Sequence, residues 1–434
     1  MQFWNVDALA YVRGAAPAQY DLLRRCGEVA GKRWRVYAVG GMVRDSLRGC
    51  PNRDLDLLVE QDGATYAECL SEYLGGSLLR HPDFCTATLT LPDGQHLDVV
   101  QTRAESYAYP GALPTVRPGT LEDDLRRRDF TANSLAVCLN ADRFGTLADA
   151  GGGYADLQEG VLRIWHDNSF ADDPTRIFRA LKYAERCGWT LEPVTERLLQ
   201  EALAAGALAT VSPARLNREL RLMLQESRAS RHLSNLLDQG VLRAWGWPLS
   251  DEAALQELLL RGESVLQTSA LGGVAGNICA AELANFWLCL ALSQADAEQG
   301  RAWLASQSFS REERKAWEQC AQLRAGEADW GDMAAVERAS RLASAVVPLL
   351  WLYAVSDEAK TREAVEGYLL SWRGMKLWLN GCEVADLLGI SGPAIREALR
   401  LLWVAQAQGW VDSRDAAKAY LLARQGQGQE SAVW

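Results

Sequence analysis

Two short apolar runs in the first hundred residues are each followed by a segment with helical periodicity. Residues 33–39 and 54–59 are short and end in apolar stretches, which predicts buried strands. Residues 42–48 and 65–74 instead repeat their apolar positions at three- and four-residue spacing, which predicts helices that glycines bring to an end. This alternation indicates an α+β region.

A hairpin and then a long helical region follow. Residues 86–91 and 96–101 flank a Pro-Asp-Gly turn at 92–94, a pattern typical of paired antiparallel strands. From about Thr120 onward the periodicity is almost wholly helical, and the glycines at 151–153 predict a flexible joint. We therefore expect an α+β region that continues into an all-α extension.

Tryptophans recur through the helical extension. At helical spacing, such residues more often fill a core than offer exposed surfaces for base stacking. We expect core packing for Trp287, Trp303, Trp317, Trp351, Trp372, Trp378 and Trp403.

Length and composition narrow the class of protein. A chain of 434 residues exceeds one ordinary core, so two or more domains are expected. The sequence has no apolar run long enough to span a bilayer and no leader pattern, which predicts a cytoplasmic protein that does not bind membranes. Its ten cysteines form no Cys-x-x-Cys pair, which argues against structural zinc. The net charge of −11 excludes a uniformly basic nucleic-acid binder but allows a local positive groove.

Paired acids provide the first candidate chemistry. Asp54 and Asp56 are two residues apart in a predicted strand, so their carboxylates point to the same face. Adjacent acids repel each other unless a cation lies between them. Mg²⁺ held by one or two carboxylates and by substrate phosphates is common in phosphoryl transfer. Asp98, on a neighbouring predicted strand, is a candidate third acid.

The turn before these acids is a candidate phosphate site. Gly40 and Gly41 lie between a predicted strand and a predicted helix, where exposed backbone N–H groups favour a triphosphate. Arg44 is placed to add a bidentate contact. Taken alone, the glycines fit a plain tight turn equally well.

Together these residues resemble the signature of the class II tRNA nucleotidyltransferases and bacterial poly(A) polymerases. Further segments resemble other elements of that family in the same order. They are residues 127–133 for ribose and triphosphate recognition, 156–163 for the hinge, 172–183 for base selection, 212–220 for the next helix, and 379–381 with 388–395 for the tail. The resemblance implies a polymerase-beta-type nucleotidyltransferase palm, a mixed sheet with helices, followed by an all-α neck, body and tail.

The family pattern implies a division of the chain and a set of site residues. It predicts a catalytic head at 1–150, a helical neck with the base-recognition helix at 151–250, and a tRNA-binding body and tail at 251–434. It implies that Asp54, Asp56 and Asp98 are catalytic and that Asp54 and Asp56 hold two Mg²⁺ ions. It assigns nucleotide binding to Gly41, Arg44, Arg128, Asp173, Arg176, Arg179 and Lys182.

The proposed base-selecting residues have suitable chemistry. Asp173, Arg176 and Arg179 recur at three-residue spacing, which predicts one face of a helix. A carboxylate accepts from an exocyclic amine and a guanidinium donates to ring nitrogens or a carbonyl oxygen, so such a set can select a base without a nucleic-acid template. Outside the family context, these residues would form an ordinary surface ion-pair network.

The resemblance predicts a template-independent enzyme that adds C, A or both to the 3′ end of tRNA from CTP and ATP, releasing pyrophosphate. Addition of only A, or only CC, is an alternative, and residues 58–63 resemble the A-adding branch. Poly(A) polymerase is another, although the Gly-Arg-Arg-Phe-Arg element of those enzymes is replaced here by residues 81–86. A non-catalytic RNA-binding protein on a decayed transferase fold is the alternative from a different class.

Three positions depart from the family pattern. Asp172 replaces a usual Glu, Lys182 a usual Arg, and Cys85 a usual Gly. Lysine keeps the positive charge but lacks the planar fork of arginine, so Lys182 bears on the geometry of base selection.

Overall fold

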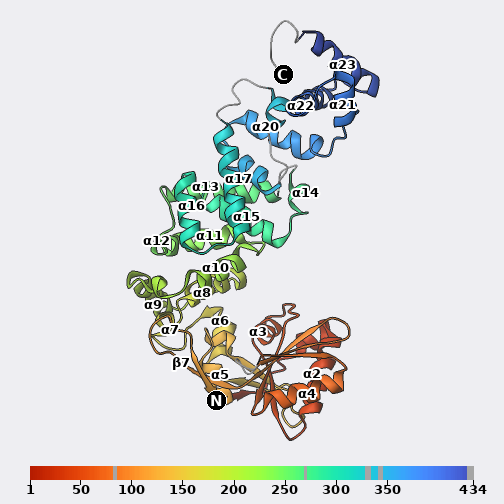
Figure 1. The fold of residues 1–434 in the computed structure, drawn as a ribbon. Coiled ribbons are helices and arrows are strands. Elements are labelled where there is room, and N and C mark those ends of the chain that lie inside the picture. Colours follow the sequence, from red (N-terminus) through yellow and green to blue (C-terminus); the bar gives the residue numbers. More distant parts are fainter. Residues whose placement is uncertain (82–85, 268–270, 328–333, 341–345, 428–434) are drawn as a thin grey trace. The chain divides into compact units, whose positions relative to one another are not determined.

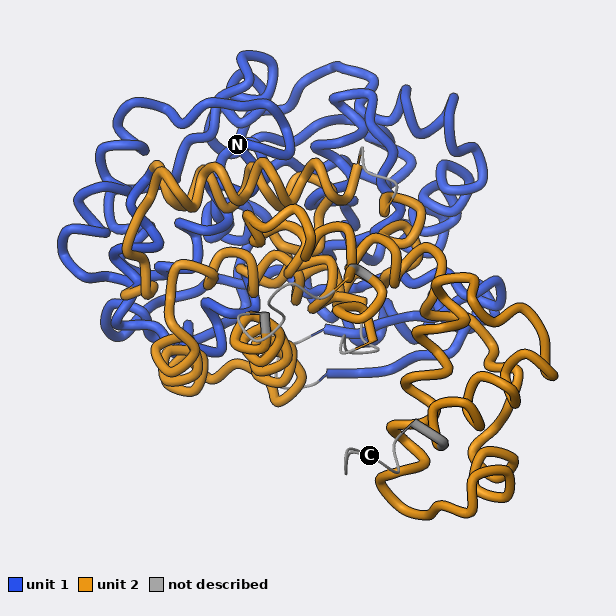
Figure 2. Tube along the Cα trace, turned by 90° about the horizontal axis from the view of Figure 1, so that it is seen from above, with its two compact units in different colours: residues 1–219, 239–245 blue, residues 220–238, 246–434 orange. Residues whose placement is uncertain are grey.

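The chain forms two compact units (Figure 2). The computed structural model describes residues 1–81, 86–267, 271–327, 334–340 and 346–427, so Cys85 lies outside the described residues. Unit 1 comprises Met1–Glu219 and Gln239–Trp245, and unit 2 comprises Leu220–Asp238 and Gly246–Trp434. The finer division into head, neck and body with tail stays a prediction.

An eight-stranded sheet organises unit 1 (Figure 1). Its strands lie in the order β1 (Gln2–Trp4), β10 (Leu147–Asp149), β9 (Leu135–Cys138), β2 (Arg35–Val39), β3 (Leu55–Glu60), β6 (His96–Gln101), β5 (Thr86–Thr90) and β4 (Ser77–His81). β3 and β6 are parallel, whereas the other neighbours are antiparallel. The predicted mixed sheet and the hairpin of β5 and β6 are therefore confirmed.

The two faces of the sheet have different neighbours. Helices α2 (Pro17–Ala30) and α4 (Gly63–Leu74) contact its central strands and each other. On another side, Leu58 of β3 belongs to a buried cluster that includes Leu121 and Leu125 of α5 (Leu121–Arg126). Since residues two apart share a face, Asp56 lies on the same face of β3 as Leu58.

The expectation of almost wholly helical structure after Thr120 is wrong within unit 1. β9 and β10 lie there and extend the main sheet, and β11 (Val161–Leu162) pairs with β12 (Thr190–Leu191). These strands are at most four residues long, and all four residues of β9 are buried. A short strand without polar alternation leaves no period-two signal, so only its partners reveal it.

The glycines at 151–153 do not form a loose joint. The backbone N–H groups of all three, and that of Tyr154, donate to the carboxylate of Asp149 at 2.9–3.0 Å. A Cβ on Gly153 would lie 2.1 Å from the Thr131 carbonyl oxygen. The segment is thus anchored at the start of α6 (Gly153–Glu159).

The remaining elements of unit 1 surround the sheet. Its helices include α1 (Ala10–Ala15), α3 (Gly41–Leu47), α7 (Ser169–Asp172), α8 (Thr175–Cys187), α9 (Pro193–Ala204), α12 (Val241–Ala244) and most of α10 (Pro213–Leu224). A separate hairpin of β7 (Arg103–Ser106) and β8 (Thr115–Pro118) was not expected from the sequence.

The described residues of unit 2 form helices joined by loops, with no strand among them, as predicted for the extension. Its helices are α11 (Ala229–Asp238), α13 (Glu252–Gln267), α14 (Gly272–Ala275), α15 (Ala280–Ala291), α16 (Ala297–Ser306), α17 (Arg311–Glu327), α18 (Ala335–Ala339), α19 (Val346–Val355), α20 (Ala359–Gly367), α21 (Gly381–Leu388), α22 (Pro393–Ala407) and α23 (Arg414–Gln427). Trp287, Trp303, Trp317 and Trp351 are buried, which confirms core packing for them. Trp378 is 43% exposed, so the prediction of core packing is wrong for this residue.

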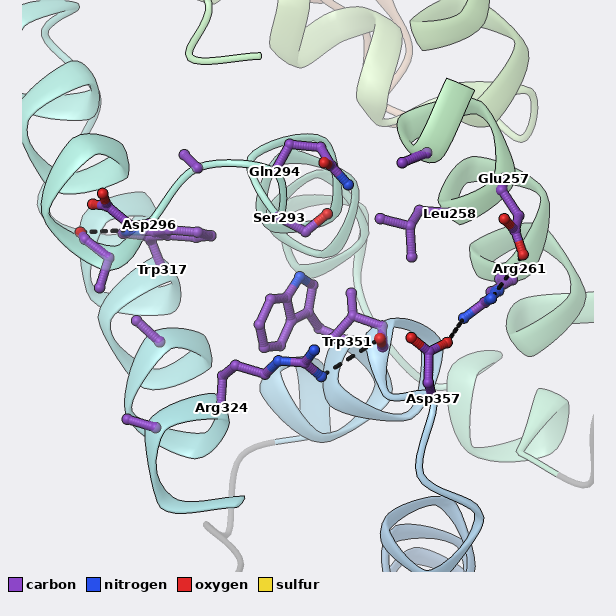
Figure 3. A pocket seen from close by; sticks show the side chains of 16 residues that line it. Glu257, Leu258, Arg261, Ser293, Gln294, Asp296, Trp317, Arg324, Trp351 and Asp357 are labelled. Atoms are coloured by element: carbon purple, nitrogen blue, oxygen red, sulfur yellow. Dashed lines mark hydrogen bonds and ion pairs between the residues drawn. The ribbon is translucent and has the colours of Figure 1, made fainter. Parts of the chain in front are cut away.

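Unit 2 also contains a cavity of about 450 Å³ (Figure 3). Trp317 and Trp351 border it with ring centroids 6.3 Å apart. The Arg261 guanidinium beside it is paired with Glu257 and with Asp357, both at 2.7 Å. The charges at its rim therefore partly neutralise one another.

Across the part of the chain that the structure describes, no helix combines the length and apolar character that a membrane span requires.

Candidate active site

Three predicted acids come together at the edge of β3 and β6. Asp56 and Asp98 are register partners on these parallel strands. Asp54 lies one residue before β3 rather than inside it, because the strand begins at Leu55. The Asp98 carboxylate accepts a 2.7 Å hydrogen bond from the Thr88 hydroxyl. The parallel pairing, which the sequence could not specify, is what aligns Asp98 with Asp56.

The charge state of Asp56 reflects this grouping. Burial raises the pKa of its carboxyl group, Arg128 opposes that rise, and Asp98 and Asp54 add to it. The carboxylates of Asp54 and Asp98 are therefore close enough to repel that of Asp56. A divalent cation at this point would relieve the repulsion.

The donor set fits a cation that shares its ligands with a substrate. Among the described residues, no group of three or more His, Cys, Asp and Glu side chains is arranged to hold a metal alone. Mg²⁺ commonly takes one or two carboxylates and completes its shell with phosphates and water. Asp54 and Asp56 match that requirement, so the residues present fit Mg²⁺.

Gly40 is required at the turn before these acids. Its φ of +76° is a conformation that favours glycine. A Cβ there would also lie 2.8 Å from an Asp56 carboxylate oxygen. The turn therefore brings the backbone at the start of α3 directly against Asp56.

A cavity of about 460 Å³ in unit 1 gathers most of the predicted residues. They come from the turn after β2, from β3, from the end of α5 and from around α8. The predicted residues that line it are Gly41, Arg44, Asp56, Arg128, Asp173, Arg176 and Arg179. A groove of about 840 Å³ in the same unit is lined by Asp54, Asp56 and Asp98. Asp56 thus borders both spaces.

Arg44 lines the cavity, but much of its guanidinium is already bound. Its Nε and Nη2 donate to the Asp45 carboxylate, both at 2.8 Å, and its Nη1 donates to Asn133 at 3.0 Å. These bonds use three of the five N–H donors of an arginine. The bidentate partner of Arg44 in this structure is therefore Asp45, and its assignment to a triphosphate stays a prediction.

Arg128 is held in a different way. The Asp124 carboxylate, which is fully buried, accepts from Arg128 at 3.2 Å and from Arg127 at 3.0 Å. Glu105 accepts from Arg127 at 3.0 Å. The Arg128 Nε is buried with no hydrogen-bond partner among the described residues. This donor is consistent with a ligand-facing arginine at the predicted triphosphate site.

The residues at α8 differ from a simple helix face. Asp173 precedes the helix, where its carboxylate accepts from the Thr175 hydroxyl at 2.6 Å and from Arg215 at 2.9 Å. Arg176 is buried and donates to the Ser169 hydroxyl at 2.6 Å. The structure still brings Asp173 and Arg176 to one cavity, because the chain turns at Pro174.

Arg179, whose side chain is partly exposed, forms an ion pair with the buried carboxylate of Asp129. Both Nε and Nη2 donate to one Asp129 oxygen, at 2.8 and 2.6 Å. Burial by itself would raise the pKa of Asp129, but Arg179 and Asn133 outweigh it and hold that pKa below its ordinary value. The pair fixes the Arg179 guanidinium at the cavity wall.

Lys182 does not line the cavity, which argues against its predicted contact with the nucleotide. Its ammonium is buried and donates to Glu219 at 3.0 Å. Burial lowers the pKa of Lys182, and Glu219 opposes that shift. The lysine that replaces the usual arginine at position 182 therefore takes part in an internal ion pair with Glu219.

Replacing Lys182 with methionine is expected to separate stability from base selection. The change leaves the buried Glu219 carboxylate without its lysine partner, so the free energy of unfolding should fall by a few kcal/mol. The ratio of CTP to ATP incorporation should change less than about threefold, because the lysine does not line the cavity. Competition between the two nucleotides below the melting temperature measures that ratio. A shift of tenfold or more would restore Lys182 to the base-selecting set.

Two cavity residues, Glu105 in β7 and Tyr107 directly after it, were not predicted from the sequence. No spacing relates them to the acids, and their strand carried no signal. Tyr183 was within a recognised segment but was not assigned. Its ring lies 5.0–5.7 Å from the cationic groups of Arg44, Arg179, Lys182 and Arg186.

Comparison with known proteins finds similar chains. Residues 36–163 match the poly A polymerase head domain. An A-adding tRNA nucleotidyltransferase of Geobacter sulfurreducens is 45% identical over 223 residues, which cover 51% of this chain and 25% of that protein. A CC-adding tRNA nucleotidyltransferase of Deinococcus radiodurans is 42% identical over 226 residues, 52% of this chain and 57% of that protein. The chain thus spans between a quarter and about half of the curated relatives it matches.

Solved structures match over nearly the whole chain. The Thermotoga maritima CCA-adding enzyme complexed with tRNA has a TM-score of 0.78 at 28% identity, and the match covers 98% of this chain and 100% of that one. CCA-adding enzyme complexes with ATP and with CTP match at 27% identity, with TM-scores of 0.81 and 0.79; the matches cover 98% and 100% of this chain and all of each of theirs. The fold is a nucleotidyltransferase palm with helical body and tail. The chain is therefore similar to tRNA nucleotidyltransferases over its first half and to the fold of CCA-adding enzymes over nearly its whole length.

Proposed function

We propose that this protein is a template-independent nucleotidyltransferase that adds C, A or both to the 3′ end of tRNA from CTP and ATP, releasing pyrophosphate. One observation carries the proposal: Asp56 borders both an arginine-lined cavity and the groove that holds Asp54 and Asp98. A transferase needs such a junction, because the acceptor and the nucleotide must approach one catalytic point from different sides.

Each space has a role in this proposal. Arg128 and the backbone around Gly41 hold the triphosphate, while Asp173 and Arg176 contact the edge of the base. The 3′-hydroxyl of the acceptor enters the groove beside Asp98, which orients it for attack on the α-phosphate. Two Mg²⁺ ions, held by Asp54 and Asp56, would activate the hydroxyl and neutralise charge on the leaving pyrophosphate. Nucleotidyltransferases of the kind this chain resembles are generally metal-dependent, which supports this assignment.

A narrower product is also supported. The Geobacter relative is named as A-adding, and residues 58–63 of this chain resemble that branch. The Deinococcus relative of similar identity is named as CC-adding, which makes partial addition a serious candidate. The size of the product separates these activities.

The test offers three acceptors, each with CTP, ATP or both. They are tRNA that ends at the discriminator base, tRNA that ends in CC, and oligo(A). Extension of the first by three nucleotides supports CCA addition, by two supports CC addition, and extension of only the second by one supports A addition. A long homopolymer on oligo(A) would replace the proposal with poly(A) synthesis. Absence of incorporation on every acceptor across a range of Mg²⁺ would refute it.

A further inference from the structure

Tyr107 is an aromatic residue that lines the cavity of unit 1. It directly follows β7, is half-buried, and lines the same space as Asp173 and Arg176. Of the described lining residues, Tyr107 and Tyr183 are aromatic. Because four cationic groups surround the Tyr183 ring, Tyr107 is the better candidate for a neutral planar partner.

A buried charge network holds the Tyr107 side chain. Its hydroxyl donates to Glu105 at 3.3 Å. The Glu105 side chain is only 6% exposed and pairs with Arg103 at 2.9 Å and with Arg127 at 3.0 Å. Tyr107 is therefore tied to the arginines beside the predicted triphosphate site.

The loop that follows Tyr107 is anchored near Asp173. The Gly111 N–H donates to the Ala171 carbonyl oxygen at 3.0 Å. Arg215 donates both to the Gly111 carbonyl oxygen, at 3.1 Å, and to Asp173, at 2.9 Å. The Arg215 guanidinium thus holds both the loop after Tyr107 and the carboxylate of Asp173.

The titration of the phenol agrees with this placement. Burial raises the pKa of Tyr107 to about 12, Arg176 opposes the rise, and Glu105 and Asp173 add to it. The charges of Arg176 and Asp173 therefore act on the hydroxyl, which stays protonated at neutral pH. A neutral phenol therefore adds no charge to the cavity beside them.

We propose that the ring of Tyr107 stacks on the base of the incoming nucleoside triphosphate, whose edge meets Asp173 and Arg176. The inference rests on the proposed function and adds a specificity-determining residue to it. Stacking suits a site that takes C, A or both, because every base has a π-face. The contacts to the base edge select among the bases, and stacking on the ring stabilises whichever base is bound.

The test measures equilibrium binding of ATP, CTP and inorganic tripolyphosphate by calorimetry in the presence of Mg²⁺. Tyr107→Leu is expected to weaken binding of ATP and CTP by roughly 5- to 100-fold, the range for lost base–aromatic stacking. Tripolyphosphate has no base, so its binding should change less than about twofold. Tyr107→Phe keeps the ring and should bind all three as the wild type does. Tyr109→Leu, at a 68% exposed residue in the same loop, is the matched control and should also bind normally.

Two outcomes overturn the inference. Equal loss for ATP and tripolyphosphate in Tyr107→Leu would mean that the residue supports the site without touching the base. Loss in Tyr107→Phe equal to that in Tyr107→Leu would assign the contact to the hydroxyl. Either result leaves the proposed function intact if the wild type extends tRNA, whereas a wild type that incorporates no nucleotide fails the proposed function itself.

Discussion

Replacing Asp56 with asparagine is expected to reduce nucleotide incorporation by at least about 10³-fold while tRNA binding is retained. Asp56 is the acid that borders both the cavity and the groove, and Gly40 approaches its carboxylate so closely that no side chain fits between them. Asparagine keeps the shape of the side chain but removes the negative charge that a divalent cation requires. Single-turnover extension of tRNA measures the chemical step, and filter binding measures the complex.

A matched control lies on the same strand. Glu60 ends β3 and, four residues from Asp56, points to the same face. Glu60→Gln removes an equal charge away from the cavity and the groove and should retain at least about half of the wild-type rate. If Asp56→Asn incorporated nucleotides at the wild-type rate, the acid pair would not be the catalytic centre. If it lost tRNA binding as well, the effect would be one of folding or of RNA contact.

Replacing Asp129 with alanine is expected to destabilise unit 1 by about 3–5 kcal/mol. The change leaves the Arg179 guanidinium without the carboxylate that accepts from its Nε and Nη2, and it removes an acceptor from the Phe130 N–H at 2.9 Å. For a unit of this size the melting temperature should fall by roughly 6–20 °C. Glu201→Ala breaks an exposed ion pair with Arg197 at 2.8 Å and should cost less than about 1 kcal/mol. Equal losses for the two variants would show that the buried Asp129 carboxylate contributes no more to stability than an exposed one.

The same pair predicts how stability depends on pH. Asp129 has a folded pKa below its unfolded value, so its contribution is present above about pH 4 and is lost as the pH falls through the lower folded pKa. Asp129→Ala lacks this contribution. Its stability should therefore decline less steeply than that of the wild type as the pH falls below 4. Urea titrations at a series of acidic pH values give the two slopes.

The elements at the site were largely predictable because their signals are local. A glycine turn between β2 and α3, a short apolar strand and a helix after Pro174 are each specified by residues close in sequence. The hairpin of β5 and β6 was found for the same reason. β9 and β10 were missed because strands of three or four buried residues show no periodicity, and they are held by pairing with segments distant in sequence.

The sequence by itself determined which kinds of chemistry the chain can perform. Two acids two residues apart, an acid on a later strand and a series of basic residues at helical spacing all follow from residue type and short-range geometry. Only the tertiary structure decided which of these charges reach the cavity. Lys182 is paired with Glu219, 37 residues away, and Arg44 with Asn133, 89 residues away, whereas the Arg128 Nε has no such partner among the described residues. Spacing cannot foresee this, because a buried cation binds whichever acceptor the fold brings near, and the donors that remain define the site.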